Sequence, residues 1–329
     1  MSACRAFLNK VMDSTDIHNK YYEKAKLGGE NKEMLKIEFL NGGLANQAFQ
    51  YIFARHFELS HPGEIMYMDD SYFALNTVHN GYELENVFGI KPHMLSEAFD
   101  ADVWEYMLSM KKAGTSIPQI LKDSGIDMDI VIEYESGQET YHSFDGNIYV
   151  GKTQIYDPQV QEFERNTYFH GYWLNCGWFK KFRKQFLEEF TFPELTDDYN
   201  KRLLDRILNE KSVSIHIRRG DYVDRNAAYK PEVYEKMVNA YMEHCDGNAV
   251  LYVFSDDIMW CRKNRESMAL DQFRDVVFVD KNTGANSYID MQLMSNCEDM
   301  IVGNSAFVFL AALLNRRKRA VINFSDREI

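Results

Sequence analysis

The chain has 329 residues, which is room for two domains of ordinary size, each with its own hydrophobic core. Hydrophobic residues make up 45% and charged residues 26%, as in soluble globular proteins. The formal net charge of −13 argues against DNA, RNA or anionic lipid as partners, because the field of the protein repels them. An anionic small ligand stays compatible with this charge, since a few arginines can create a local positive pocket.

Cysteine usage and hydropathy point to the cytoplasm. The cysteines are widely spaced, form no CxxC pair and number five, so free thiols in a reducing compartment are expected. No stretch approaches the roughly 20 apolar residues that a transmembrane helix needs. Residues 1–35 are polar and lack a signal-peptide core, and we expect a solvated helical extension there. Contact of this extension with a membrane surface stays open.

The first half of the chain begins with a strand at 36–40, a glycine turn, and a helix in which Phe49, Ile52, Phe53 and Phe57 recur at helical spacing. A second strand is expected at 65–68, and helices from 102 to about 129 with a break at Pro118. Residues 137–156 are rich in turns and aromatic side chains and receive no assignment. A helix at 178–190 should end at the Phe-Pro pair 192–193, and another is expected at 199–208.

The C-terminal part alternates strands and helices regularly. We expect strands at 213–217, 249–254, 276–279, 300–302 and 320–324, and helices at 231–244, from 256, at 288–295 and at 306–314. This alternation predicts right-handed crossovers and a parallel sheet, which binds ligands beyond the carboxyl ends of its strands. The domain boundary is expected between about 193 and 211, so that residues 36–205 form an N-terminal domain and 206–329 a C-terminal one.

The strongest local feature is the segment SIHIRRGDYV at 214–223. Alternation along a strand places His216 and Arg218 on one face, and Arg219 follows just past the strand. Guanidinium groups match phosphate oxygens two at a time. Adjacent arginines are also often a surface pair bound to carboxylates, but at the end of a buried parallel strand we favour an anion site.

Two strand-to-helix turns suit a phosphate as well. One contains Gly43, Asn46 and Gln47, and the other contains Asn304 and Ser305. Helix N-termini carry unpaired N–H groups and partial positive charge. The simpler alternatives are plain helix entries, capped by Asn46 in the first turn and by Ser305 in the second.

The pair Asp256 and Asp257 follows another predicted strand, after Ser255. Such carboxylates can bind a divalent metal, accept hydrogen bonds from a guanine ring, or cap the next helix. No further ligands occur at metal spacing, so a metal is the least favoured of the three, and the same holds for Asp69 and its neighbour. The sequence has no HExxH or GxSxG pattern, which leaves zinc and serine hydrolases without support.

These pieces occur in the same order in one family. The sequence resembles glycosyltransferase family 11, the galactoside α-1,2-fucosyltransferases, in their bacterial form. The matching segments are GGLANQAFQYIFAR at 42–55, HNGYELENVFGI at 79–90, YFHGYWLNCGWFKKFRKQFLEEFTF at 168–192, SIHIRRGDYV at 214–223, YVFSDD at 252–257 with Trp260, and DMQLMSNCEDMIVGNSAF at 290–307.

The resemblance implies a GT-B-like α/β fold, in which two Rossmann-type domains with parallel sheets face an interdomain cleft and the C-terminal domain holds GDP. It implies inverting, metal-independent transfer of L-fucose from GDP-β-L-fucose to the 2-hydroxyl of galactose in a glycan, without a cofactor. His216, Arg218 and Asp221 are the expected catalytic residues. The expected donor-binding residues are Gly43, Asn46, Gln47, Arg219, Ser255, Asp256, Asn304 and Ser305.

The acceptor side is less specific. Asp221 is the first choice for the general base, with Asp69 and Glu83 behind it, and Asp221 equally suits a structural role. His79, Tyr82, Tyr172 and Trp173 are expected beside Asp69 and Glu83 in an acceptor groove, against the alternative of aromatic core packing.

Two alternatives to the fucosyltransferase stay open. The family usually reads SSFSWWGAW where this chain has SAFVFLAA from Ser305, and relatives usually continue beyond the last strand, which favours a non-catalytic GDP-sugar or glycan binder. A transferase of the same fold with another nucleotide sugar or linkage is the other. The fucosyltransferase and the alternative transferase are both expected to act in surface polysaccharide synthesis. Peripheral association with membrane-bound glycan intermediates stays open.

Overall fold

The computed structural model describes residues 34–325, except 78–79, 134–140, 142, 153–154 and 246. The N-terminal extension at 1–33 and His79 therefore lie outside the described residues. Contacts between Cα atoms divide the chain into two units. The first contains the residues up to Tyr82 together with Lys91–Phe182, and the second contains Glu83–Ile90 together with Arg183–Ile329.

The first unit is built on a five-stranded parallel sheet with the strand order β2-β1-β5-β3-β4. Its strands are β1 (Lys36–Phe39), β2 (Met66–Asp69), β3 (Asp129–Ile132), β4 (Ile148–Val150) and β5 (Thr167–His170). Its helices are α3 (Leu44–Ser60), α4 (Ser71–Leu75), α6 (Ala101–Lys112), α7 (Ile117–Asp123) and α9 (Cys176–Lys181), with 3-10 turns at Leu95–Ala98 and Pro158–Gln161.

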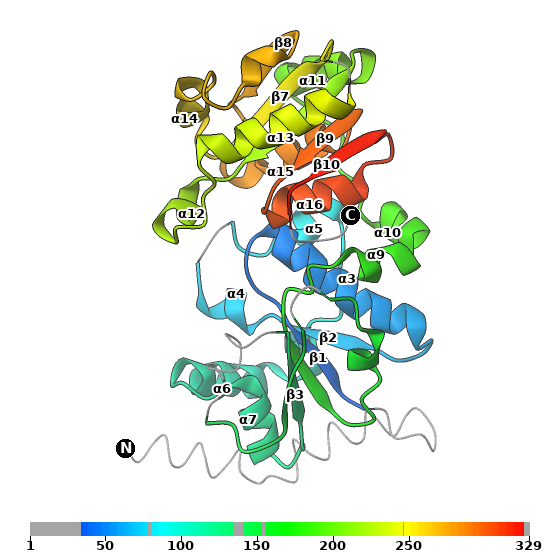
Figure 1. Ribbon diagram of the computed structural model, residues 1–329. Helices are drawn as coiled ribbons and strands as arrows, with labels where there is room; N and C mark the ends of the chain where they lie inside the picture. Colours follow the sequence, from blue (N-terminus) through cyan, green and yellow to red (C-terminus); the bar gives the residue numbers. More distant parts are fainter. Residues whose placement is uncertain are drawn as a thin grey trace. The chain divides into compact units, whose positions relative to one another are not determined.

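Helices cover both faces of this sheet (Figure 1). On one face, Phe53 of α3 packs edge-on against Phe169 of β5. On the other face, Met107 of α6 and Ile120 of α7 share a buried cluster with Ile37 of β1. The predicted break in the helical region before 129 is confirmed, because Pro118 lies in the first turn of α7, where its missing N–H costs nothing.

The second unit holds another five-stranded parallel sheet, with the order β10-β9-β6-β7-β8. Its strands are β6 (Ser212–Ile217), β7 (Val250–Ser255), β8 (Asp275–Val279), β9 (Asp299–Val302) and β10 (Ala320–Asn323). Its helices are α5 (Leu84–Phe88), α10 (Arg183–Glu189), α11 (Asp198–Asn209), α12 (Gly220–Asp224), α13 (Pro231–His244), α14 (Ile258–Lys263), α15 (Tyr288–Met294) and α16 (Ala306–Leu314), with 3-10 turns at Leu270–Gln272 and Gly284–Asn286.

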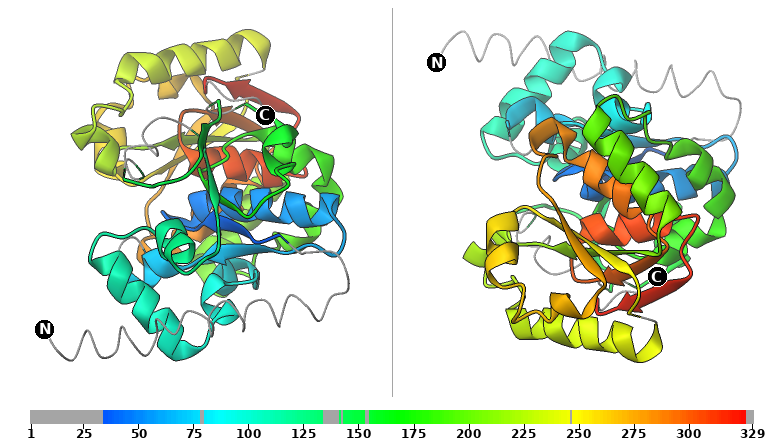
Figure 2. Two further views of the ribbon diagram at one scale, coloured as in Figure 1. Left: turned by 90° about the horizontal axis from the view of Figure 1, so that it is seen from below. Right: turned by 90° about the horizontal axis from the view of Figure 1, so that it is seen from above.

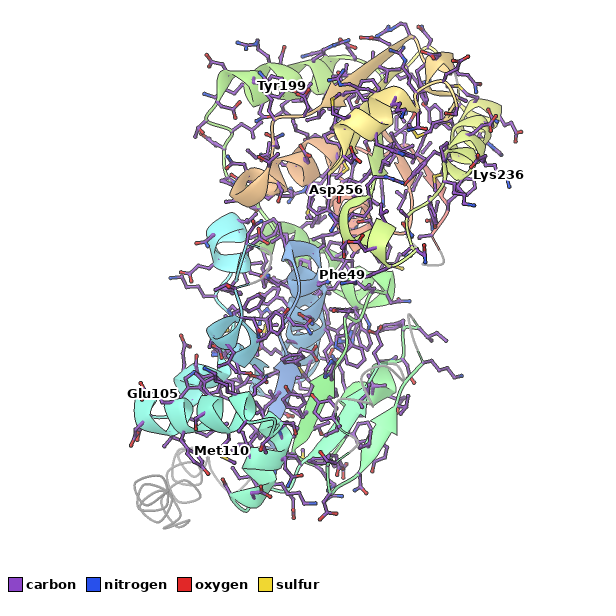
Figure 3. The ribbon with its side chains drawn as sticks, turned by 90° about the vertical axis from the view of Figure 1, so that its left-hand side faces the viewer. Phe49, Glu105, Met110, Tyr199, Lys236 and Asp256 are labelled. Atoms are coloured by element: carbon purple, nitrogen blue, oxygen red, sulfur yellow. The ribbon has the colours of Figure 1, made fainter. Side chains whose placement is uncertain are left out.

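In this unit too the sheet lies between helices, with α13 on one face and α15 and α16 on the other (Figure 2). The labelled Tyr199 of α11 and Lys236 of α13 flank the sheet from opposite sides (Figure 3). Met237 and Tyr241 of α13 are completely buried against Ile215 of β6. The predicted α/β class with parallel sheets in two units is confirmed.

The sequence-based elements of the second unit agree closely with the structure, whereas three strands of the first unit were missed. β3 begins where the expected helical region ends, β4 lies in the segment 137–156 that received no assignment, and β5 had no assignment either. The helix expected at 178–190 is two helices, because the backbone of Phe182 leaves the helical region at φ −120° and ψ 35°. The ring of Phe182 contacts His56 of the first unit, whereas Phe190 packs on Phe88 of the second. The chain therefore changes unit at this break.

The division between the units falls at Phe182, earlier than the boundary expected between 193 and 211. Helix α11 packs on α15, and Phe190 and Phe192 both contact Phe88, so these segments belong with the second sheet.

Four cysteines in the described part of the chain are free thiols: Cys176, Cys245, Cys261 and Cys297. A search of that same part found no helix with the length and apolar character that crossing a membrane requires.

Candidate functional site

Three neighbouring strands of the second unit end at one edge of its sheet. β6 lies between β7 and β9, and all three run parallel. His216 is on β6, Arg218 and Arg219 follow it, Asp256 follows β7, and Ser305 follows β9. Asp256 is labelled at this edge in Figure 3. The structure thus brings together the predicted residues of the second domain at the carboxyl end of a parallel sheet, where such sheets bind ligands.

The guanidinium of Arg218 is held between two carboxylates. Its Nη2 donates to Asp221 Oδ1 at 2.7 Å, and its Nη1 lies 2.7 Å from Asp256 Oδ2. Asp256 Oδ1 accepts the backbone N–H of Arg219 at 2.8 Å. A Cβ on Gly220 would come within 2.7 Å of Asp256 Oδ2, so a glycine is required for this close approach. Paired with two partners, Arg218 has a defined orientation rather than the freedom of a surface arginine.

Arg219 is oriented by an aromatic ring. Its guanidinium carbon lies 4.0 Å from the centre of the Trp260 ring, a cation–π distance. Its Nε is buried and has no hydrogen-bond partner among the described residues. Since a buried donor without a partner is costly, Arg219 has donor capacity available for a ligand.

His216 is neutral in this environment. It is 8% exposed, and its ring centre lies 5.4 Å from that of Phe307. Burial, and in second place the charge of Arg218, lowers the pKa of His216 to about 3. Its Nδ1 is buried without a partner in the described part of the chain. The imidazole can therefore exchange a hydrogen bond with a ligand but adds no positive charge to the site.

The remaining second-unit residues have local structural roles. Ser255 donates its hydroxyl hydrogen to the carbonyl of Ile217 at 2.6 Å, which joins the ends of β6 and β7. Ser305 accepts the Phe307 N–H at 3.2 Å and caps α16, so the predicted cap is confirmed. Asn304 donates to the carbonyl of Ala227 at 3.2 Å. Asp256, expected to contact guanine, has one oxygen on the Arg218 guanidinium and the other on the Arg219 N–H, and the guanine contact stays a prediction.

In the first unit, the glycine turn is organised by glutamine side chains. Gln47 is fully buried and donates to the carbonyls of Gly42 at 2.8 Å and Gly81 at 2.9 Å. Its amide is thus committed to the loops, which contradicts the expected contact with a donor. The N-cap of α3 is Gly43, so the alternative of a cap by Asn46 is wrong.

Several expected acceptor residues belong to the interior. Trp173 is 4% exposed and stacks on Phe53 at 4.0 Å, so the expectation that it lines a groove is wrong and core packing is correct. Asp69 is fully buried, which rules out direct proton transfer from an acceptor. Tyr172 and Tyr82 are half-buried instead: Tyr172 donates its backbone N–H to Glu133, and the Tyr82 ring is tilted against that of Phe73 with 6.2 Å between ring centres.

The other base candidates are also constrained. Asp221 accepts from Arg218 and lies 3.6 Å from Arg225, so the structural alternative describes it better than the role of a free base. Glu83 is 5% exposed, precedes α5 and groups with the second unit.

Sequence reasoning missed a polar chain on the α6 face of the first unit. Tyr168 donates to Asp69 Oδ2 at 2.6 Å, and the Tyr141 hydroxyl lies 2.9 Å from His170 Nδ1. Lys111 Nζ lies 3.6 Å from Asp69 Oδ2. The available signal was a histidine two residues after a tyrosine in YFHGYW, at the end of a strand that had not been recognised.

No group of three or more His, Cys, Asp or Glu side chains is arranged to hold a metal ion among the residues that the structure describes.

Comparison with known proteins agrees with this arrangement. The sequence model "Glycosyl transferase family 11" matches residues 138–328. The chain is 38% identical over 151 residues to an alpha-1,2-colitosyltransferase of Escherichia coli, covering 44% of this chain and 50% of that protein. It is 27% identical over 300 residues to the O-antigen biosynthesis glycosyltransferase WbnK of Escherichia coli, covering 84% and 89%. It is 28% identical over 157 residues to galactoside alpha-(1,2)-fucosyltransferase 1 of Ateles belzebuth, covering 42% and 41%.

The family model covers more than half of the chain, in a protein whose two units each hold a parallel sheet. The chain is a glycosyltransferase, and it belongs to glycosyl transferase family 11. The matches to the colitosyltransferase and to the monkey enzyme span half or less of those proteins.

Proposed function

We propose that this enzyme transfers L-fucose from GDP-β-L-fucose to the 2-hydroxyl of a galactose residue in a glycan, with inversion at the anomeric carbon. The observation that carries the proposal is the pair of oriented guanidinium groups, Arg218 and Arg219, at the carboxyl end of β6. The names of two relatives support the α-1,2 linkage, and one of them names a galactoside acceptor and fucose.

The arginines suit a departing diphosphate. Breaking the bond between fucose and GDP gathers negative charge on the β-phosphate, and donors already aimed at that charge lower the barrier. Arg219 offers an Nε that has no partner among the residues the structure describes, and the N-terminus of α16 follows the neighbouring strand. Because these groups supply the positive charge, we propose that the reaction needs no metal ion and no cofactor.

The test is GDP binding by calorimetry with and without EDTA. Arg218→Ala should lower the affinity at least about tenfold, the effect of losing about 1.4 kcal/mol. The matched control is Arg319→Ala. Arg319 pairs with Glu298 just before β9, so this ion pair lies at the amino ends of the strands, away from the carboxyl ends that carry Arg218. Unchanged GDP affinity in Arg218→Ala, or an equal loss in both variants, refutes the assignment. Loss of transfer in EDTA refutes metal independence.

A second donor is favoured by one specific observation. The identity of 38% is to a protein named as a colitosyltransferase, and colitose is fucose without its 3-hydroxyl. A donor competition with equal GDP-fucose and GDP-colitose decides between them, with the linkage read from the product. A site that hydrogen-bonds the 3-hydroxyl should reject colitose strongly, because its polar groups would be left unpaired. Preference for colitose overturns fucose as the donor.

A non-catalytic GDP-sugar or glycan binder would give a different result. It would bind GDP in the same calorimetry and transfer neither sugar to any galactoside in a glycan panel. A thermal-shift comparison of GDP, UDP and CDP separates the nucleotide choice from turnover, because a tight ligand raises the melting temperature by mass action.

We further propose that the reaction occurs in the cytoplasm during assembly of a surface polysaccharide, and the name of WbnK, an O-antigen biosynthesis glycosyltransferase, supports the polysaccharide. Fractionation of cells that produce the full chain tests this, and recovery of activity in an exported fraction contradicts it.

A further inference from the structure

Arg218 and Arg219 lie at the same strand edge but are held by different kinds of group. Arg218 lies between two carboxylates, each at 2.7 Å. Arg219 is half-buried and lies over an indole, with its guanidinium carbon 4.0 Å from the centre of the Trp260 ring. The Arg219 side chain forms no salt bridge within the described part of the chain, so its charge is the one that an anion would meet without a balancing carboxylate.

An indole suits this position because it attracts a cation without neutralising it. The face of the ring is negative through its quadrupole, and the ring has no acceptor atom that would occupy an N–H of the guanidinium. In agreement with this, the buried Nε of Arg219 has no partner among the described residues. A carboxylate in the same place would cancel the charge and take up the donors.

The indole is itself fixed in two ways. The backbone N–H of Trp260 donates to Asp257 Oδ1 at 3.0 Å, in the first turn of the helix α14 that follows β7. The ring also packs against the hydrophobic core of the second unit, with 6.5 Å between its centre and that of the Tyr234 ring on α13. Trp260 therefore has a defined position from which it can orient Arg219.

Nearby carboxylates explain why such a partner is useful. Asp256 Oδ1 accepts the backbone N–H of Arg219 at 2.8 Å, and Asp257 follows directly in the chain. Without the ring, the Arg219 side chain could turn to these carboxylates and form an ion pair. A cation–π contact contributes about 0.5–2 kcal/mol and an exposed ion pair about 0–1 kcal/mol, so the ring is the stronger partner.

We propose that Trp260 is a positioning residue for donor binding, which holds the Arg219 guanidinium for the diphosphate and keeps it from the carboxylates of the same edge. Trp260 acts through Arg219 and does not touch the nucleotide. All of these residues belong to the second unit. The inference rests on the proposed function for the identity of the nucleotide, whereas the positioning of Arg219 applies to any nucleoside diphosphate.

The first test measures the Kd for GDP by calorimetry after the ring is replaced. Trp260→Leu retains apolar bulk but has no quadrupole, so it should raise the Kd about 2–30-fold, the equivalent of about 0.5–2 kcal/mol. Trp260→Phe should give an intermediate Kd, because its ring attracts a cation more weakly than an indole does. The matched control is Trp104→Leu, since Trp104 is a half-buried tryptophan of the first unit. An unchanged Kd in Trp260→Leu overturns the proposal, and so does an equal loss in the control.

A double-mutant cycle separates positioning from direct contact. In an Arg219→Ala background, Trp260→Leu should raise the Kd for GDP no further, because the ring has no guanidinium left to orient. An equal loss with and without Arg219 would mean that the indole contacts the nucleotide itself, which contradicts the proposal.

Pyrophosphate as a competitor of GDP examines the same question with a ligand that has no base. Its affinity should fall in Trp260→Leu by the same factor as that of GDP, because Arg219 is assigned to the diphosphate. A loss for GDP alone assigns the ring to the nucleoside and overturns the proposal.

Fluorinated tryptophans at position 260 test the electrostatic origin of the effect. Each ring fluorine weakens the negative face of the indole and changes its shape little, so the logarithm of the Kd for GDP should rise with the number of fluorines. A ring that only fills space would give the same Kd throughout the series, and that result refutes the cation–π role. The series also decides the matter if Trp260→Leu does not fold.

Failure of the proposed function gives a different pattern. If the unaltered protein binds UDP or CDP and not GDP, the donor assignment fails, and the Trp260 variants are measured with the nucleotide that binds. If it binds none of the three, both proposals fall. If it binds GDP and Trp260→Leu binds GDP equally well, only the role of Trp260 fails.

Discussion

Replacing Asp290 by Asn should stabilise the protein, and more so at alkaline pH. Asp290 lies on α15, is 9% exposed and accepts a hydrogen bond from Asn282 at 2.7 Å. Burial raises the pKa of this carboxyl from 3.8 to about 7. A rise of about three units corresponds to ~4 kcal/mol of lost stability once the group is ionised.

The sign follows from proton binding. Between pH 3.8 and about 7 the folded state retains a proton that the unfolded chain has lost, so stability falls as the pH rises through this window and is constant above it. At pH 4.5 about 1 kcal/mol of the cost has developed, so the difference between variant and wild type should grow by ~3 kcal/mol between pH 4.5 and pH 8.

The assay is urea unfolding, followed by circular dichroism, at those two pH values. The matched control is Asp275→Asn in the same unit, where a hydrogen bond from Arg206 lowers the pKa of the carboxyl. There the carboxylate contributes stability that is present at high pH and lost as the pH falls, so its removal should act in the opposite direction. A stability difference for Asp290→Asn that is equal at both pH values refutes the reasoning.

Four substitutions test the turns that follow β1, β6 and β9. Gly220→Ala should cost ~1–3 kcal/mol through overpacking against the Asp256 carboxylate and should weaken GDP binding, whereas Gly303→Ala, whose Cβ would have only ordinary contacts at 3.5 Å, should leave the melting temperature unchanged or slightly raised. Ser305→Ala removes the cap of α16 and should cost ~1 kcal/mol in urea unfolding. Gly42→Ala should cost ~1–2 kcal/mol by thermal unfolding, since Gly42 has φ +78°; unchanged stability would show that this turn relaxes.

The second unit was predictable because its signals are local. β7 is an apolar run and β6 alternates polar and apolar residues, and β6, β7 and β9 are each followed by a turn and a helix. Asp257 and Ser305 cap the helices that follow them, as their residue types indicate. Local propensity and tertiary structure agree here, which is the condition under which a sequence specifies its fold most clearly.

The first unit was harder for a physical reason. β3 and β5 have four residues each, but so do β1 and β2, which were predicted, so strand length does not explain the difference. The pairing of β3 and β5 depends on distant segments: the N–H of Thr167 donates to the carbonyl of Leu35, and β5 inserts between β1 and β3. Pairings of this range leave no trace in a short window of sequence.

The site shows the same division between local and distant information. Residue type and strand position located Arg218 and Arg219 at the right edge. Of the two carboxylates that orient Arg218, Asp221 lies nearby in α12, but Asp256 lies 38 residues further on. The predictions for Gln47 and Trp173 were wrong. A sequence does not reveal whether a polar side chain bonds its own loop, as Gln47 does, or whether an aromatic ring packs in the core, as Trp173 does.

The pairing of Arg218 with two carboxylates has a consequence for the proposed donor. Under the proposed function, a diphosphate shares the Arg218 guanidinium with Asp256, whose Oδ2 lies 2.7 Å from Nη1. That sharing should lower the affinity for GDP but leaves the guanidinium preorganised, which benefits the state with the most phosphate charge. Charge on the β-phosphate is greatest as the sugar departs, so the exchange from carboxylate to phosphate favours the transition state over the bound substrate. An acidic protein can thereby hold two arginines at an anion site without attracting anions indiscriminately.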